Sequence, residues 1–251
     1  MRENIKQVKS RYENCQLEEI PDFIRSVESD ERTGVKKIKE AAKKAYDKYI
    51  KELERIEQMK QYERQYDSCQ YICGIDEVGR GPLAGPVVAG AVILPKDCSI
   101  LYINDSKQLS PAKREQIYDE IMEKAIAVGI GLVSHTRIDE INILQATYEA
   151  MRIAISRLKV EPEVLLNDAV TIPEVKIPQV PIIKGDAKSI SIAAASIVAK
   201  VTRDRLMVDM DQIYPGYDFA KNKGYGSKKH MEAIKQIGPC KIHRQSFIKN
   251  I

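Results

Sequence analysis

The sequence has 251 residues, of which 43% are hydrophobic and 30% are charged, a composition that suits one sizeable folded core with an appendage. Its first residues lack the apolar centre of a signal peptide, and no run approaches the roughly 18 uncharged apolar residues of a membrane span. We therefore expect a cytoplasmic protein with no membrane partner, and we also expect a monomer. The net charge of +4 does not by itself indicate a nucleic-acid partner.

The segment before about residue 70 is expected to be helical. Pro21 is well placed to begin a helix, and apolar residues recur at helical spacing between Ile38 and Ile56. Ten Lys or Arg stand against six Asp or Glu between Lys36 and Arg64. We predict that residues 1–70 form a small helical N-terminal extension.

From Tyr71 onward, short apolar segments bounded by Gly and Pro alternate with helical patterns. Ser110 and Pro111 predict the beginning of one helix, and further helices are expected over 139–158 and 189–214. This mixture indicates an α/β domain over residues 71–251, with a mixed sheet flanked by helices. The expected strands are 71–76, 87–94, 128–134, 163–168 and 180–185.

Several common catalytic motifs are missing from the sequence. The three histidines show no H-E-x-x-H spacing, and neither G-x-S-x-G nor a G-x-x-x-x-G-K-[ST] phosphate loop occurs. Cys69 and Cys73 stand four apart, which differs from the C-x-x-C of a zinc or redox motif. The remaining candidates for chemistry are carboxylates that follow apolar strands.

Four acidic residues have this position: Asp76, Glu77, Asp168 and Asp186. Carboxylates gathered at one edge of a sheet repel one another unless a positive charge lies among them. Mg²⁺ or Mn²⁺ fits such a site, because both take oxygen ligands, and two such ions promote phosphodiester hydrolysis. Neighbours on a regular strand point to opposite faces, so a shared site requires Glu77 to lie where the strand ends or bends.

Charge is also uneven near the C-terminus. From Gly216 to the end, eight Lys or Arg stand against two acids. Such a segment is either a solvated basic surface or a surface that faces a polyanion, and the charge alone does not decide between them.

The motifs, taken together, resemble bacterial ribonuclease HII. They occur in one order between about residues 71 and 247, while the first 70 residues lie outside them. The matching segments are GIDEVGRGPLAGPVVAGAVIL at 74–94, NDSK at 104–107, KGDAKS at 184–189, AAASIVAKVTRD at 193–204, NKGYGSKKH at 222–230 and HRQSF at 243–247.

The resemblance implies a ribonuclease H-like fold and endonucleolytic cleavage of the RNA strand in RNA–DNA hybrids. It also implies cleavage 5′ to a single ribonucleotide in duplex DNA, giving a 3′-hydroxyl and a 5′-phosphate. The implied catalytic and metal-binding residues are Asp76, Glu77, Asp168 and Asp186. Around the third acid, Asn-Asp-Ala replaces the more usual Val-Asp-Gly, and the fourth acid is matched through Lys-Gly-Asp.

The same resemblance implies a substrate-binding set. The main chain of Gly79, Arg80 and Gly81 is expected to read the 2′-hydroxyl that distinguishes RNA from DNA. Tyr225 is expected to pack on the next deoxyribose and to bond the 2′-hydroxyl. The candidate phosphate contacts are Ser106, Lys107, Lys184, Lys188 and Arg203.

Two alternatives stay open. Ribonuclease HIII shares the four acids, although it typically has Gly-Lys-Gly and lacks the Gly-Tyr-Gly tyrosine. A non-catalytic hybrid-binding module would be expected to have lost at least one acid, and all four are present.

Overall fold

The computed structural model describes residues 3–251, which form two compact units: one up to Glu57 and one from Gln58 onward. The first unit is helical and contains α1 (Ile5–Glu13), the 3-10 helix η1 (Leu17–Glu19), α2 (Ile20–Ser26) and most of α3 (Thr33–Met59). As predicted, Pro21 lies in the first turn of a helix, α2. The predicted domain boundary at residue 70 stays a prediction.

The first unit has a small apolar core of its own. Phe23 of α2 lies 5.5 Å from Tyr12 of α1, measured between ring centroids. The buried residues of this core are Val8, Ile20, Phe23, Val27, Val35 and Ala42. Because α3 buries only one side here, six of its seven lysines lie exposed on the opposite side.

The second unit is built on a mixed five-stranded sheet with the order β3-β2-β1-β4-β5. β1 pairs antiparallel with β2 and parallel with β4, so it is the central strand. The five predicted strands are confirmed, with the bounds Ile72–Val78 (β1), Val87–Ile93 (β2), Ala127–Val133 (β3), Val164–Asp168 (β4) and Gln179–Ile182 (β5).

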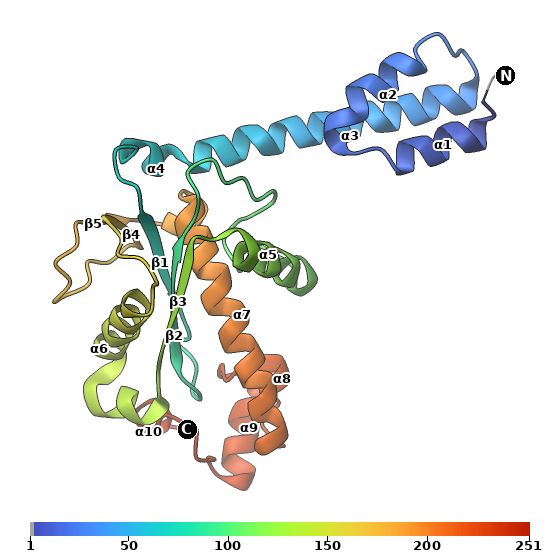
Figure 1. Cartoon of the computed structure of the whole chain (residues 1–251). Coiled ribbons are helices and arrows are strands. Elements are labelled where there is room, and N and C mark those ends of the chain that lie inside the picture. The colour runs from blue at the N-terminus through green and yellow to red at the C-terminus, as the bar shows by residue number, and fades with distance from the viewer. Residues whose placement is uncertain (1–2) are drawn as a thin grey trace. The chain divides into compact units, whose positions relative to one another are not determined.

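Helices cover both faces of the sheet (Figure 1). α6 (His135–Ser156) packs on β2 and β3, while α7 (Ile190–Ile213) packs on β1 and β2 on the other face. A close approach of α7 requires Gly74 and Gly90, since a Cβ at either position would overlap the α7 backbone. The mixed α/β architecture predicted from the sequence is therefore confirmed.

Serine side chains cap the longer helices that begin in the second unit. Ser110 accepts a hydrogen bond from the Lys113 amide, which confirms the predicted beginning of α5 (Pro111–Lys124). α6 begins four residues before the predicted Asp139 and contains a break at Asn142. The remaining elements are α4 (Gln61–Gln65), the 3-10 helix η2 (Gly185–Ala187), α8 (Phe219–Asn222), α9 (Lys228–Ile237) and α10 (Gln245–Ile248).

Short helix α4 packs with the second unit. Glu63 accepts hydrogen bonds from the Ser189 hydroxyl at 2.6 Å and from the Ser191 amide at 3.0 Å, so it holds the N-terminus of α7. Among residues 3–251, no helix has the length and apolar content needed to cross a membrane.

Candidate active site

The parallel pairing of β1 with β4 brings two of the predicted acids together. Ile75 pairs with Asn167, so the residues that follow them, Asp76 and Asp168, lie side by side at the carboxyl ends of their strands. β5 continues the sheet next to β4 and leads into η2, which contains Asp186. The amide of Gly185 donates a hydrogen bond to Asp168 Oδ1 at 2.8 Å, which ties η2 to the end of β4.

Glu77 is the penultimate residue of β1. The sequence required the strand to end or bend at this residue, and β1 in fact continues in register to Val78. However, β1 pairs with β4 only as far as Ile75. On its other side, Glu77 pairs with Ala89 of β2. Its carboxylate is mostly buried and lies 3.3 Å from the Arg80 guanidinium.

Burial and mutual repulsion act on these acids. The pKa of Asp76 is raised well above its ordinary value by burial and then by the charge of Glu77, while a hydrogen bond from Ser196 opposes the rise. Burial also raises the pKa of Glu77, and the nearby Arg80 opposes that rise. For Asp186, burial and the charges of neighbouring acids raise the pKa.

The donor set therefore fits a hard divalent cation. The charge of Asp168 contributes to the raised pKa of each of the other three acids, so all four share one electrostatic environment. Within residues 3–251, no three His, Cys, Asp or Glu side chains already converge in coordinating geometry. A bound cation would supply the positive charge that the buried carboxylates require, through the oxygen ligands that Mg²⁺ and Mn²⁺ prefer.

The loop after β1 presents its backbone beside this acid cluster. Gly79 has a φ of +92°, and a Cβ there would overlap the buried side chain of Arg203, so both the conformation and the space require glycine. Arg80 and Gly81 are exposed. The position of a Cβ on Gly81 lies 3.8 Å from Tyr225 Cε1, which places the tyrosine ring directly beside the Gly-Arg-Gly backbone.

Two buried arginines fix this loop. Arg244 donates to the carbonyls of Gly79, Arg80 and Gly85 at 2.6, 2.8 and 2.9 Å. Burial and, to a smaller extent, the charge of nearby Arg203 together lower its pKa to about 9. Each of the three guanidinium nitrogens of Arg244 thus donates to a backbone carbonyl, so the side chain clamps the backbone of this loop.

The structure gives Arg203 a different role from the phosphate contact predicted for it. Its side chain is fully buried, and it donates to the carbonyls of Pro86, Lys223 and Ala84 at 2.9, 2.8 and 3.1 Å. A phosphate contact by Arg203 was therefore a wrong prediction, because the guanidinium is used to join the loop after β1 to the loop that carries Tyr225. The Tyr225 ring lies 5.9 Å from this guanidinium and is 42% exposed.

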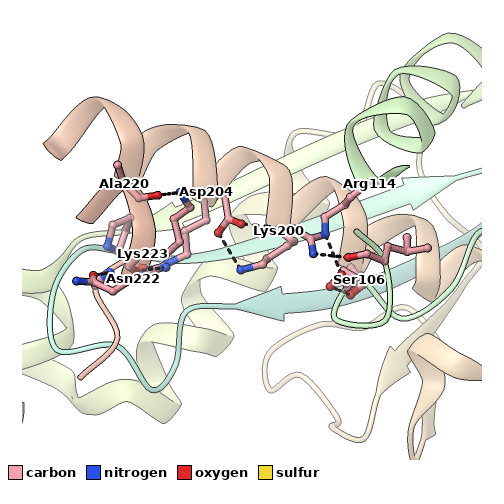
Figure 2. A network of polar contacts seen from close by, with 12 residues as sticks. Ser106, Arg114, Lys200, Asp204, Ala220, Asn222 and Lys223 are labelled. Atoms are coloured by element: carbon pink, nitrogen blue, oxygen red, sulfur yellow. Dashed lines mark hydrogen bonds and ion pairs between the residues drawn. The ribbon is translucent and has the colours of Figure 1, made fainter. Parts of the chain in front are cut away.

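A polar network around Arg114 holds the loop at 104–107 (Figure 2). Arg114 donates to the Ser106 carbonyl at 2.8 Å and forms an ion pair with Asp204 of α7 at 3.6 Å. The Ser106 hydroxyl is itself buried and lies 3.0 Å from the Ser196 hydroxyl. The structure therefore places Ser106 beneath the surface of the loop, and substrate contact by its hydroxyl stays a prediction.

The other basic candidates are exposed. Lys107 Nζ lies 3.9 Å from Asp186 Oδ2, which brings it to the acid cluster, and its side chain is 76% exposed. Lys184 and Lys188 flank η2 and are exposed as well. Their roles as phosphate contacts stay predictions.

Some residues of the site had no predicted role. Ser196 supports Asp76, and Asp105 adds a further negative charge that raises the pKa of Asp186. Arg244 clamps the Gly-Arg-Gly loop. All three lie in segments that carried the family resemblance, which was the signal available for them, but their local sequence gives no sign of what they contact.

Comparison with known proteins is consistent with this geometry. Residues 73–250 match the sequence model of the family described as ribonuclease HII, and residues 4–67 match that of the ribonuclease HII N-terminal domain. A ribonuclease HII from Lachnoclostridium phytofermentans is 70% identical over 223 residues, which cover 89% of this chain and 88% of the relative. One from Clostridioides difficile is 50% identical, covering 99% and 98%.

Solved structures show the same fold. The chain resembles the ribonuclease H2 of Pyrococcus horikoshii with a TM-score of 0.58 and 29% identity, covering 70% of this chain and 93% of that one. The likeness to the ribonuclease H3 of Aquifex aeolicus, at 16% identity and a TM-score of 0.55 with coverages of 71% and 72%, concerns the fold alone. This chain therefore belongs to the ribonuclease HII family and is an enzyme of the ribonuclease H type.

Proposed function

We propose that the enzyme cleaves the RNA strand of RNA–DNA hybrids and also cuts duplex DNA 5′ to a single embedded ribonucleotide. The products are a 3′-hydroxyl and a 5′-phosphate. The observation that carries this proposal is the continuity of β1 with the loop after it: Asp76 and Glu77 lie near the end of the strand, and Gly81 faces Tyr225 a few residues later. One chain supplies all of these residues, which fits a monomer.

We propose Asp76, Glu77, Asp168 and Asp186 as the catalytic residues that hold two divalent cations, Mg²⁺ or Mn²⁺. When bound, the cations would activate the attacking water and stabilise the leaving oxygen of the phosphodiester. The protein orients the carboxylates: the Glu77 amide donates to Asp76 Oδ1 at 2.7 Å, and the Gly185 amide donates to Asp168 Oδ1 at 2.8 Å. Support comes from the crowding of these acids: burial and repulsion raise the pKa values of Asp76, Glu77 and Asp186, and a cation would supply the compensating positive charge.

Recognition of the ribose is assigned to the backbone of Gly79, Arg80 and Gly81, with Tyr225 on the adjacent sugar. The exposed Gly81 has no side chain that would obstruct a 2′-hydroxyl, and Arg244 holds the loop in one conformation. The 42% exposed Tyr225 ring offers a surface on which a sugar can pack.

Phosphate contacts are assigned to the lysines around the acid cluster. Lys107, Lys184 and Lys188 are exposed, and Lys107 already lies near Asp186. Such contacts position a duplex without reading its sequence. Ser106 is assigned to the same surface through its loop, since its own hydroxyl is buried.

We also propose residues 1–70 as a helical extension of a catalytic domain at 71–251. Its α3 exposes a set of lysines on the side opposite its core, and these would add affinity for the phosphates of a duplex. The set, which we name the α3 lysine face, comprises Lys36, Lys37, Lys43, Lys44, Lys48 and Lys51.

A strand-specific nicking assay tests the proposal. With Mg²⁺ or Mn²⁺ the wild-type enzyme is expected to cut a DNA duplex that carries one ribonucleotide and to leave the all-DNA duplex intact. Asp76→Asn should abolish cleavage while duplex affinity in Ca²⁺ changes little, because it removes a ligand charge but no phosphate contact. The exposed acid Glu161 provides a matched control, and Glu161→Gln should cut normally. Cleavage of the all-DNA duplex, or normal turnover by Asp76→Asn, would refute the proposal.

A further inference from the structure

Two buried histidines lie directly behind Tyr225 and have no part in the chemistry proposed above. His230 of α9 and His243 are 0% and 1% exposed, and they pack against Tyr217 and Phe219. Their Nε2 atoms lie 3.0 Å apart. His230 Nδ1 lies 2.8 Å from the Tyr225 carbonyl oxygen, so the pair reaches the backbone of the residue assigned to ribose recognition.

The hydrogen-bond partners fix which nitrogens carry protons. A carbonyl oxygen only accepts, so His230 Nδ1 must donate to Tyr225, and His230 Nε2 of the neutral ring must then accept. The donor facing that nitrogen is therefore His243 Nε2. This leaves His243 Nδ1 as an acceptor for the Cys240 amide at 2.9 Å.

The surroundings of His243 Nδ1 agree with an acceptor role. The Cys240 thiol, at 3.2 Å, is a second donor that faces this nitrogen. The Cys240 carbonyl is also 3.2 Å away, but it already accepts from the amide of His243 itself at 3.1 Å. The result is a directed chain of donors from Cys240 through His243 and His230 to Tyr225, which we name the donor chain.

The residue after His243 holds the other half of the recognition site. Arg244 donates to the Gly79 and Arg80 carbonyls, and its own amide donates to the Leu83 carbonyl at 2.8 Å. Adjacent residues of one segment therefore fix both the Gly-Arg-Gly backbone and, through His230, the Tyr225 loop.

We propose that His243, acting through His230, is a positioning residue that sets the Tyr225 ring against the Gly79–Gly81 backbone and thereby sets the preference for a single ribonucleotide over a continuous hybrid. This inference rests on the proposed function, because it assigns the support of Tyr225 to a specific hydrogen-bond chain. His243 touches no substrate in this scheme, and its side chain acts through His230 on the Tyr225 carbonyl.

The donor chain requires both imidazoles to be neutral. A proton on His230 would set its Nε2–H against that of His243, and a proton on His243 would set Nδ1–H against the Cys240 amide. Burial lowers the pKa of both rings, that of His243 to about 4. The other titratable or charged groups around the pair are Cys240, Tyr217, Arg244 and His135.

The test compares variants that keep or remove the donor at His243. Phe fills the ring space without a donor, whereas Gln places an N–H near the former Nε2. Activity is measured as kcat/KM on a duplex with one ribonucleotide and on a continuous RNA–DNA hybrid. His243→Phe is expected to lower the ratio of the two values about tenfold, since it leaves a buried acceptor on His230 unpaired. His243→Gln should give the wild-type ratio again. His135→Gln, which lies outside the donor chain, should leave the ratio unchanged.

A double variant separates positioning from general damage to the fold. Because His243 acts through Tyr225, His243→Phe combined with Tyr225→Ala should show the same substrate ratio as Tyr225→Ala alone. Equal losses on both substrates for His243→Phe, or full additivity in the double variant, would overturn the inference. Circular dichroism spectra confirm that each variant is folded before its ratio is measured.

NMR spectra of the imidazole nitrogens test the donor chain independently of any cleavage assay. The wild-type spectra are expected to show protons on His230 Nδ1 and His243 Nε2 at neutral pH. The opposite tautomer of either ring would overturn the inference. A wild-type enzyme that cuts neither substrate would instead refute the proposed function, while the NMR result would still decide whether the donor chain exists.

Discussion

Replacing His243 with Gln is expected to remove the part of any acid-induced loss of stability in the second unit that arises from this histidine. Burial lowers the pKa of His243 from its ordinary value of 6.5 to about 4. Between these values the unfolded chain binds a proton more readily than the folded chain does. The stability due to a neutral His243 is therefore fully present above the unfolded pKa and is lost progressively as the pH falls toward the folded pKa.

The size of this loss follows from the two pKa values. With an unfolded pKa of 6.5 and a folded pKa of about 4, the contribution of His243 to the free energy of unfolding should fall by about 2 kcal/mol between about pH 7 and about pH 5. The raised pKa values of Asp76, Glu77 and Asp186 act in the opposite direction, because the folded chain then binds protons more readily. Since both proteins retain these acids, the difference between wild type and His243→Gln isolates the histidine.

Urea unfolding without metal, followed by circular dichroism at several pH values, measures this difference. The stability advantage of the wild type over His243→Gln should shrink by about 2 kcal/mol from about pH 7 to about pH 5. Any effect of Gln that does not depend on pH shifts the whole curve and leaves its slope unchanged. Parallel pH curves for the two proteins would show that His243 is not held neutral by burial, and the reasoning would be refuted.

Three further predictions concern other parts of the chain. Ala169 has a φ of +55°, where a side chain is disfavoured, so Ala169→Gly should raise the free energy of unfolding by about 1 kcal/mol in urea titrations; a decrease would contradict this. The double variant Lys44→Glu, Lys48→Glu on the exposed side of α3 should weaken duplex binding at nearly unchanged kcat. It should also reduce the slope of log affinity against log salt concentration by about 2. An unaltered slope would exclude α3 from the nucleic-acid surface. Tyr225→Ala should lower kcat/KM on a single embedded ribonucleotide roughly ten- to hundredfold, and less on a continuous hybrid; equal losses would assign Tyr225 a structural role.

Local sequence patterns were sufficient for the five strands and for α5, α6 and α7, but they did not predict the helices α8, α9 and α10. Apolar runs bounded by Gly and Pro predicted all five strands, and Ser110 followed by Pro111 predicted the beginning of α5. These signals work because capping and strand burial depend on residues that are close in sequence. Acids at strand ends were also visible, since a carboxylate after a buried strand must emerge at an edge of the sheet.

The strand order and the meeting of the acids required the tertiary structure. Asp76 and Asp168 are neighbours only because β1 and β4 pair in parallel, with Ile75 opposite Asn167. A strand pattern specifies burial but not which strand lies next to it. The order β3-β2-β1-β4-β5 was therefore open until the chain was folded.

The roles of the basic residues depended on the fold even more strongly. The sequence by itself determined that Arg203 and Arg244 belong to the motifs of the family, but a positive charge there indicated phosphate as readily as backbone. The structure surrounds both guanidinium groups with carbonyls from the loop after β1, which lies more than a hundred positions away in sequence. It likewise directs His243 to His230 and on to Tyr225. Such partners are decided by which chain segments meet in the folded core, because a buried donor bonds the acceptor that packing brings to it and local sequence does not record that acceptor.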